Sequence, residues 1–249
     1  MIDKISEPAR DYTAADIMIC TMARLIQNRE TVFHGVSSHM PMLALLLAKS
    51  MHAPDAVYLN IPGGVDPEVI KIKDYTSAGG ELCEDAQAMF PLQDIFDLSM
   101  RGGLDVAFLS GIQFDEQGNM NASVIGDYKR PKVRMPGGAG SAVLIPTAKR
   151  AIIWRTKHDA RTFVKNVDFI TTRGNIDKIV TPLCVFRFRQ GKLELDTVHP
   201  TATFEQVQDN TAFPLSQNAV GITPAPTVDE MSLLNRIDPQ GIREIEFAK

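Results

Sequence analysis

The sequence predicts an α/β fold: a mostly parallel open sheet with helices on both faces, some antiparallel strands and a C-terminal hook. Three observations predict it. Short apolar strands end in glycine or proline, and they alternate with segments of helical periodicity. This order is typical of a parallel sheet covered on both faces. Gln190–Gly191 lies between two strand-like segments, which indicates a hairpin turn and therefore some antiparallel pairing.

Local signals place the individual elements. Thr13 and Asp16 approximate a capping box, and the apolar spacing that follows as far as Ile26 predicts an amphipathic helix. We expect strands at residues 30–33, 56–61, 104–110, 150–154, 168–171, 184–188 and 192–195. We expect further helices at residues 42–49, 90–100 and 229–237.

Composition indicates one globular unit. The 249 residues are 44% hydrophobic and 22% charged, which is enough apolar material for a sizeable core. There is no internal repeat and no low-complexity tract, so we expect a single domain over residues 1–249. Its C-terminal extension, about residues 215–249, contains a proline-stiffened link at 223–228.

Charge and hydropathy argue against two classes of partner. A formal net charge of −4 is unlike a general nucleic-acid binder. The longest strongly apolar run, residues 40–48, is far short of the ~20 residues that cross a bilayer.

Residues 1–7 mix acids and bases without the apolar core of a secretory signal. The three cysteines show no metal-binding or disulfide spacing, so we expect buried thiols and a cytoplasmic protein.

Four loops are candidates for carrying chemistry. Residues 35–41, 60–66 and 111–127 follow predicted parallel strands, where ligands of open α/β sheets bind. The fourth, residues 134–142, holds three glycines within four positions. Glycine lets a backbone press close to a ligand and aim N–H groups at an anion or a thioester oxygen, although a flexible connector has the same composition. The loop matches neither a Walker A nor a dinucleotide fingerprint, which argues against those nucleotides.

The strongest motif resembles a known family. Residues 111–126 read G-I-Q-F-D-E-Q-G-N-M-N-A-S-V-I-G, and Gly-Gly-Ala-Gly follows about ten residues later at 137–140. This pairing resembles the β subunits of class I CoA-transferases of the glutaconate type. The resemblance takes in residues 35–41, 53–55 and 237–239 and so spans nearly the whole chain. It identifies the superfamily and leaves the substrate open.

The resemblance implies a catalytic glutamate that this chain lacks. In such β subunits a glutamate directly after the Ala-Pro-Asp strand attacks the acyl-CoA and forms a glutamyl-CoA thioester. Counting from Ala53 places Ile61 at that position, and a slip of one residue places Asn60 there. Neither side chain replaces a carboxylate nucleophile. Enzymes similar to the ring-opening hydrolases of bacterial steroid degradation also lack this glutamate and take their carboxylate from the partner subunit.

The catalytic candidates lie in the first two loops. Ser37, Ser38 and His39 are placed to bind a substrate carboxylate or to activate water, although such residues also occur in ordinary capping loops. Asn60 is expected to help recognise the substrate, next to Ile61 at the position of the family glutamate.

A second set is expected to hold the acyl-CoA. Its members lie in the motifs of the resemblance: Gly63, Gln113, Asn119, Asn121, Gly137, Gly138, Ala139 and Gly140. Coenzyme A enters as a thioester substrate, and no permanently bound cofactor is expected. The other four histidines are isolated and no pair has metal-ligand spacing, so no metal site is expected.

The sequence therefore predicts a β-type subunit of a heteromeric CoA-transferase-family enzyme. An α-type subunit would complete the active site in a heterodimer or heterotetramer, acting on an acyl-CoA and a small carboxylic acid. Two alternatives stay open: a hydrolase or carbon–carbon bond-cleaving enzyme acting on a CoA-linked ring intermediate, and a non-catalytic subunit.

Overall fold

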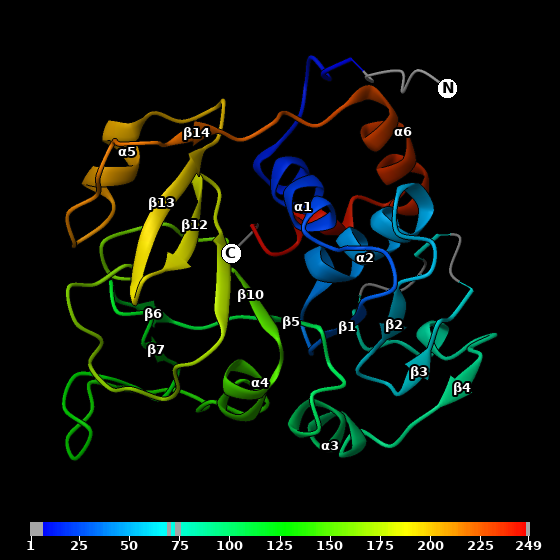
Figure 1. Cartoon of the computed structure of the whole chain (residues 1–249), viewed down its shortest axis with the longest axis horizontal. Helices are drawn as coiled ribbons and strands as arrows, with labels where there is room; N and C mark the ends of the chain where they lie inside the picture. Colours follow the sequence, from blue (N-terminus) through cyan, green and yellow to red (C-terminus); the bar gives the residue numbers. More distant parts are fainter. Residues whose placement is uncertain (1–6, 69–70, 73–75, 248–249) are drawn as a thin grey trace.

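One mixed sheet runs through the molecule. The computed structural model describes residues 7–68, 71–72 and 76–247, so residues 1–6, for which no secretory signal is expected, lie outside it. In order across the sheet the strands are β14 (Gly221–Ile222), β13 (Lys192–Val198), β12 (Cys184–Arg189), β11 (Ile176–Val180), β10 (Arg150–Trp154), β5 (Val106–Leu109), β1 (Thr31–His34), β2 (Val57–Leu59), β3 (Gly64–Val65) and β4 (Ala88–Met89). Figure 1 shows this sheet with its helices.

The centre of the sheet is parallel and its flanks are mixed. The strands from β11 to β2 pair in parallel. On one flank β12 runs antiparallel to both β11 and β13, and β13 pairs in parallel with β14. On the other flank β3 runs antiparallel to β2 and β4. The predicted mostly parallel sheet with some antiparallel strands is therefore confirmed.

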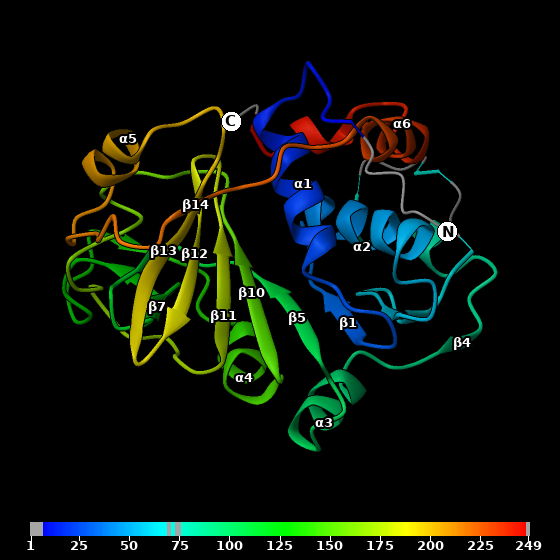
Figure 2. The same cartoon turned by 45° about the horizontal axis from the view of Figure 1, so that its top comes forward.

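Helices cover both faces. Helices α1 (Ala14–Arg24), α2 (His39–Met51) and α6 (Val228–Ile237) gather on one face, and α3 (Asp94–Met100) and α4 (Ser141–Thr147) lie together on the other (Figures 1 and 2). The short helix α5 (Phe204–Asp209) follows β13. None of the helices in the described ranges has the length and apolar content needed to cross a membrane.

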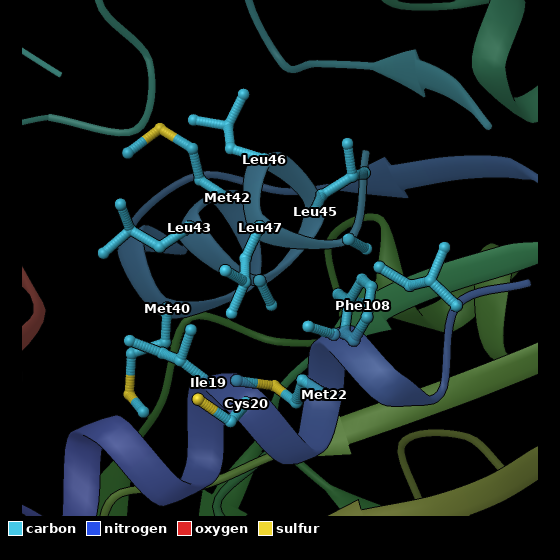
Figure 3. Packing of buried hydrophobic residues seen from close by; sticks show 14 of the residues in the cluster. Ile19, Cys20, Met22, Met40, Met42, Leu43, Leu45, Leu46, Leu47 and Phe108 are labelled. Atoms are coloured by element: carbon cyan, nitrogen blue, oxygen red, sulfur yellow. The ribbon is translucent and has the colours of Figure 1, made fainter. Parts of the chain in front are cut away.

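Strand β5 divides the interior into two apolar clusters. Val106 and Phe108 belong to the cluster beneath α1 and α2, whereas Ala107 and Leu109 belong to the cluster on the α3 and α4 face. Figure 3 shows side chains of α1 and α2 meeting beside Phe108. Because both faces of β5 are covered, every residue of this strand is apolar.

Local sequence signals explain several boundaries. Thr13 accepts a hydrogen bond from the backbone of Asp16, and the Asp16 side chain accepts one from the backbone of Thr13, so the predicted capping box is present. Gln190 and Gly191 have φ values of 53° and 80° and join β12 to β13, which confirms the predicted hairpin. Positive φ at both positions matches the twist of the two strands.

Some predicted elements differ. The strand expected at residues 168–171 is wrong, because its polar groups bond to neighbouring loops: the Asp168 carboxylate accepts from Gly126 N, and the Thr171 hydroxyl accepts from Ala122 N. The helix expected at 90–100 begins only at Asp94, and the one expected at 42–49 begins at His39.

Two small hairpins in the central loops were not predicted. They pair β6 (Gln113–Phe114) with β7 (Met120–Asn121) and β8 (Val124–Ile125) with β9 (Val133–Arg134). Strands of two residues are too short to produce a recognisable pattern.

The C-terminal segment returns to the first helices. After β14 the chain crosses α1 and places α6 against α2. Arg24 fixes this crossing, because its guanidinium donates to the carbonyls of Pro224 and Ala225 and forms an ion pair with Glu230. The segment described above as a C-terminal hook thus lies against the first two helices.

Replacing Phe108 with alanine tests the central role of β5. The side chain is fully buried, so we expect Phe108→Ala to lower the free energy of unfolding by about 3–5 kcal/mol. Urea unfolding measures this change. The control Ile222→Ala removes a side chain that is 76% exposed and should change stability little; equal losses in the two variants would contradict the assignment.

Candidate active site

The predicted site loops meet at one edge of the sheet. Strands β1, β2, β5 and β10 are parallel, so their carboxyl ends lie at the same edge. Figure 2 shows β10, β5 and β1 side by side. Loops 35–39, 60–63 and 110–113 leave from this edge, which is where open α/β sheets bind ligands.

The first loop turns sharply into α2. Ser37 is exposed and has a φ of 49°, a conformation that few residues other than glycine adopt. Ser38 is buried; its N–H donates to the Ser77 hydroxyl at 2.8 Å, and its own hydroxyl donates to Val36 O. Of the two serines, only Ser37 has a solvent-accessible side chain.

His39 is held by the C-terminal segment. Its Nδ1 lies 3.0 Å from Glu246 Oε1, and its backbone N–H donates to the same oxygen at 3.1 Å. A carboxylate is favourable here, because it accepts one of the free N–H groups at the start of α2. The two residues are 207 positions apart, and no sequence pattern indicated the pair.

The polar side chain of the second turn, Asn60, bonds to the protein backbone and not to solvent. Asn60 is fully buried, donates to Leu82 O at 2.7 Å and accepts from Gly64 N at 2.8 Å. Ile61 packs against the apolar cluster on the α3 and α4 face. Gly63 has a φ of 100°, and a Cβ there would lie 2.3 Å from Phe90 O. Residues 60–63 therefore present no carboxylate at this edge.

A buried pair behind these loops was not predicted. His34 Nε2 lies 2.6 Å from the Tyr58 hydroxyl, and His34 Nδ1 lies 3.0 Å from Gly35 O. Burial lowers the pKa of His34 to about 4 and raises the pKa of Tyr58 well above its ordinary value. The neutral imidazole thus carries its proton on Nδ1, and Nε2 accepts from the tyrosine.

Gln113 and Asn121 form a buried amide network at the open end of the β6–β7 hairpin. Gln113 Oε1 accepts from Asn121 Nδ2 at 2.7 Å and from Asp168 N at 3.1 Å. Asn121 Oδ1 in turn accepts from Ser123 N. Both side chains are buried, so they fix the loop rather than face solvent.

The glycine loop is fastened to this network. Gly137 N donates to Ala122 O, and Ala122 N donates to the Thr171 hydroxyl. A Cβ on Gly138 would lie 2.8 Å from both Ala142 and Thr171, so the position has no room for a side chain. The loop continues through Ala139, whose φ is 41°, and Gly140 into α4.

The glycine loop offers free N–H groups. Within the described part of the chain, the backbone N–H groups of residues 138–141 donate to no protein acceptor. Consecutive N–H groups of this kind stabilise a developing oxyanion. The structure thus brings Gln113, Asn121 and residues 137–140 together.

Asn119 lies elsewhere. It sits in the turn at the closed end of the hairpin, where its Nδ2 donates to Asp115 Oδ2 at 3.0 Å and its N–H donates to Asp115 Oδ1. The structure therefore separates Asn119 from the glycine loop by the length of the hairpin.

Arg155 and Trp154 complete the edge beside β5. The Ser110 hydroxyl donates to Trp154 O at 3.0 Å, which ties the ends of β5 and β10 together. Arg155 follows directly, and its buried Nε has no hydrogen-bond partner among the described residues. Burial lowers the pKa of Arg155, and the charge of Asp159 opposes this shift. Arg155 was not predicted as a site residue, although a basic side chain directly after the predicted strand 150–154 was an available signal.

Two further histidines, His158 and His199, lie in a separate cluster, whereas His52 is exposed and its Nε2 lies 3.0 Å from Ile26 O. His158 contacts the hydroxyls of Thr181 and Thr211, and His199 contacts Thr223. Burial lowers the pKa of each of these histidines to about 4. Residues 7–68, 71–72 and 76–247 contain no group of three or more histidine, cysteine or acidic side chains able to hold a metal ion.

Comparison with known proteins identifies the family. The sequence model of the family described as Coenzyme A transferase matches residues 16–210, most of the chain. The chain belongs to the coenzyme A transferase family. Among its relatives is one of the subunits of the 3-oxoadipate CoA-transferase of Pseudomonas knackmussii, 33% identical, with 91% of this chain and 94% of the relative covered.

Other relatives within the family catalyse different reactions. The cholesterol ring-cleaving hydrolase IpdB subunit of Rhodococcus jostii is 25% identical, with 98% of this chain and all of the relative covered. A crystal structure of the decarboxylase AibA/AibB superposes with a TM-score of 0.88 at 28% identity, covering 94% of this chain and 98% of the other. These similarities leave the reaction of this coenzyme A transferase family member open.

Three histidines with lowered pKa values predict a loss of stability in acid. His34, His158 and His199 have folded pKa values near 4 and an ordinary value of 6.5, so the unfolded chain binds more protons between these limits. We expect full stability above pH 6.5 and a loss of about 3 kcal/mol per histidine by pH 4. Urea unfolding at a series of pH values measures the slope. His199→Gln should remove about a third of it, and a flat profile from pH 6.5 to 5 would contradict the prediction.

Proposed function

We propose that this chain is the β-type subunit of a heteromeric enzyme that acts on an acyl-CoA thioester. The observation that carries the proposal is the row of free N–H groups at residues 138–141, in a loop that is fastened by the hydrogen bond from Gly137 N to Ala122 O. Such donors stabilise the oxyanion that forms when a thioester carbonyl is attacked. Coenzyme A enters and leaves as part of the substrate.

An α-type subunit completes the site in this proposal. Several relatives are named as single subunits of larger enzymes, and the related decarboxylase has two components. Residues 60–63 of this chain offer no carboxylate, so the nucleophile or base comes from the partner in a heterodimer or heterotetramer. Ser37 faces the substrate, while Ser38, His39 and Asn60 hold the two loops in shape.

Two reaction classes fit such a site. One is transfer of CoA between an acyl-CoA and a small carboxylic acid, as the name of the Pseudomonas relative indicates for that protein. The other is hydrolysis or carbon–carbon bond cleavage on a CoA-linked intermediate without an acyl-enzyme. Ile61, apolar and packed against the core, favours this second class, because a covalent mechanism needs a nucleophile at that position.

The location we propose is the cytoplasm. Cys20, Cys83 and Cys184 are free thiols, and two of them are buried. Free buried thiols are typical of proteins in a reducing compartment.

Chemical trapping tests whether this chain forms an acyl-enzyme. The purified complex is incubated with an acyl-CoA, treated with borohydride or hydroxylamine, and analysed by mass spectrometry of each subunit. We expect no modification of this chain, because no carboxylate stands at residues 60–63. An Ile61→Glu variant restores an acid at that position and serves as the positive control. A trapped glutamyl adduct on the unaltered chain would contradict the proposal.

Replacing Gly138 distinguishes a catalytic from a non-catalytic subunit. A side chain there collides with Ala142 and Thr171 and displaces the donor row, so Gly138→Val should lower turnover of the complex about 100-fold or more. Gly80→Ala is the matched control, because a Cβ at Gly80 meets nothing within 4 Å. Unchanged turnover in Gly138→Val would show that this loop takes no part in the reaction.

A further inference from the structure

Arg155 differs from the other half-buried arginines of this protein. Arg150 is also half-buried, and its guanidinium reaches the carboxylates of Glu30 and Asp177 at 2.9 Å. Arg24 is paired with Glu230. Arg155, in contrast, forms no ion pair and donates no side-chain hydrogen bond within residues 7–68, 71–72 and 76–247.

Asp159 does not supply Arg155 with an ion-pair partner. Asp159 acts on Arg155 electrostatically, but its carboxylate accepts from the N–H groups of Arg161 and Thr162 and lies 3.6 Å from the Arg161 guanidinium. A desolvated charge without a partner is costly, and proteins retain one where a ligand or a partner supplies the opposite charge.

The register of the sheet places Arg155 beside the candidate site. Ile153 pairs with Leu109 across β10 and β5, so continuing the register sets Arg155 opposite Gly111. Gly111 begins the loop that leads to Gln113. The bond from the Ser110 hydroxyl to Trp154 O holds these two strand ends together.

Strand alternation gives the face on which the side chain lies. Ala151 and Ile153 belong to the cluster on the α3 and α4 face, and Ile152 and Trp154 to the opposite one. Successive side chains of a strand alternate, so Arg155 lies on the α3 and α4 face. Ile61 and α4, which follows the glycine loop, are on this same face.

The outer part of the guanidinium remains accessible. Nε is the only atom of Arg155 among the buried polar atoms without a partner, and the residue as a whole is half-buried. The two terminal nitrogens of the guanidinium therefore reach solvent, while Nε is held in the protein interior. A planar guanidinium presented in this way matches a carboxylate, which it binds through two parallel hydrogen bonds.

We infer that Arg155 binds a carboxylate of the substrate at a point remote from the thioester and thereby selects acyl groups that carry a second acid. The inference rests on the proposed function, because it requires the acyl group to lie between the glycine loop and the end of β10. It deepens that function by giving the acyl group a chemical class and by assigning specificity to a residue outside the family motifs described above.

Matched thioesters test the inference. Calorimetry on the purified complex compares glutaryl-CoA with pentanoyl-CoA, which has the same chain length and lacks the second carboxylate. We expect Arg155→Gln to weaken glutaryl-CoA binding about 10- to 100-fold and to leave pentanoyl-CoA unchanged. The glutaryl-CoA affinity of Arg155→Lys should lie between those of the unaltered protein and Arg155→Gln, because lysine keeps the positive charge and loses the two parallel hydrogen bonds of the guanidinium. Arg189→Gln, an exposed arginine on β12, is the control.

Other outcomes overturn the inference in recognisable ways. Equal losses for both thioesters, or no loss for either, would exclude selection through the second carboxylate. Dissociation of the Arg155→Gln complex on size exclusion would assign the residue to a carboxylate of the partner subunit. If the unaltered complex bound neither thioester, the proposed function itself would fail, and that result is distinct from the others.

A stability measurement separates recognition from a structural role. An arginine that serves the fold, such as Arg150, should lower the melting temperature when it is replaced by glutamine, because two carboxylates lose their partner. Arg155→Gln should leave the ligand-free melting temperature unchanged or raise it. A melting temperature that falls as far as that of Arg150→Gln would contradict a role in substrate binding.

Discussion

The parallel pairing of β5 between β1 and β10 is the constraint on which the rest of the structure depends. It places the strand ends at one edge, so that loops from distant parts of the sequence meet there. It also requires β5 to be apolar on both faces, and Phe108 and Leu109 therefore serve different clusters. The four residues of β5 thus contribute both to stability and to the geometry of the site.

At the edge itself, most polar side chains are used to hold backbone in place. Gln113 bonds to Asn121 and to Asp168, and Asn60 bonds to Leu82 O and to Gly64 N within the second turn. In the site that we propose, the groups left for a ligand are the main-chain N–H groups of residues 138–141, the Ser37 hydroxyl and the Arg155 guanidinium. A site of this design is rigid, because its donors are positioned by hydrogen bonds that are already formed.

The sequence was sufficient for the features that depend on local chemistry. The capping box at Thr13, the Gln190–Gly191 turn and the strand at 150–154 all follow from a few adjacent residues. It was insufficient where tertiary contacts decide. The segment 168–171 has the composition of a strand, but its hydrogen bonds go to loops.

The candidate site divides in the same way. The loops after β1, β2 and β5 were predicted at one edge, because parallel strands all end there. The glycine loop precedes α4, and this argument did not place it. The partners of individual side chains were not predictable. Glu246 reaches His39 across 207 positions. The Arg155 guanidinium is recognised as unpaired only in the folded structure, where Nε has no hydrogen-bond partner among the described residues. Which side chains bond to one another depends on tertiary packing, and the periodicity of the sequence does not indicate it.

Trp154 gives this arrangement a practical consequence. It is the single tryptophan of the chain, 5% exposed, and its carbonyl is bonded to the residue that precedes the Gly111 loop. Tryptophan fluorescence of this subunit therefore originates from one indole, which packs in the apolar cluster beneath α1 and α2. Emission excited selectively at this indole becomes a label-free optical signal for the packing of that cluster, without any added dye.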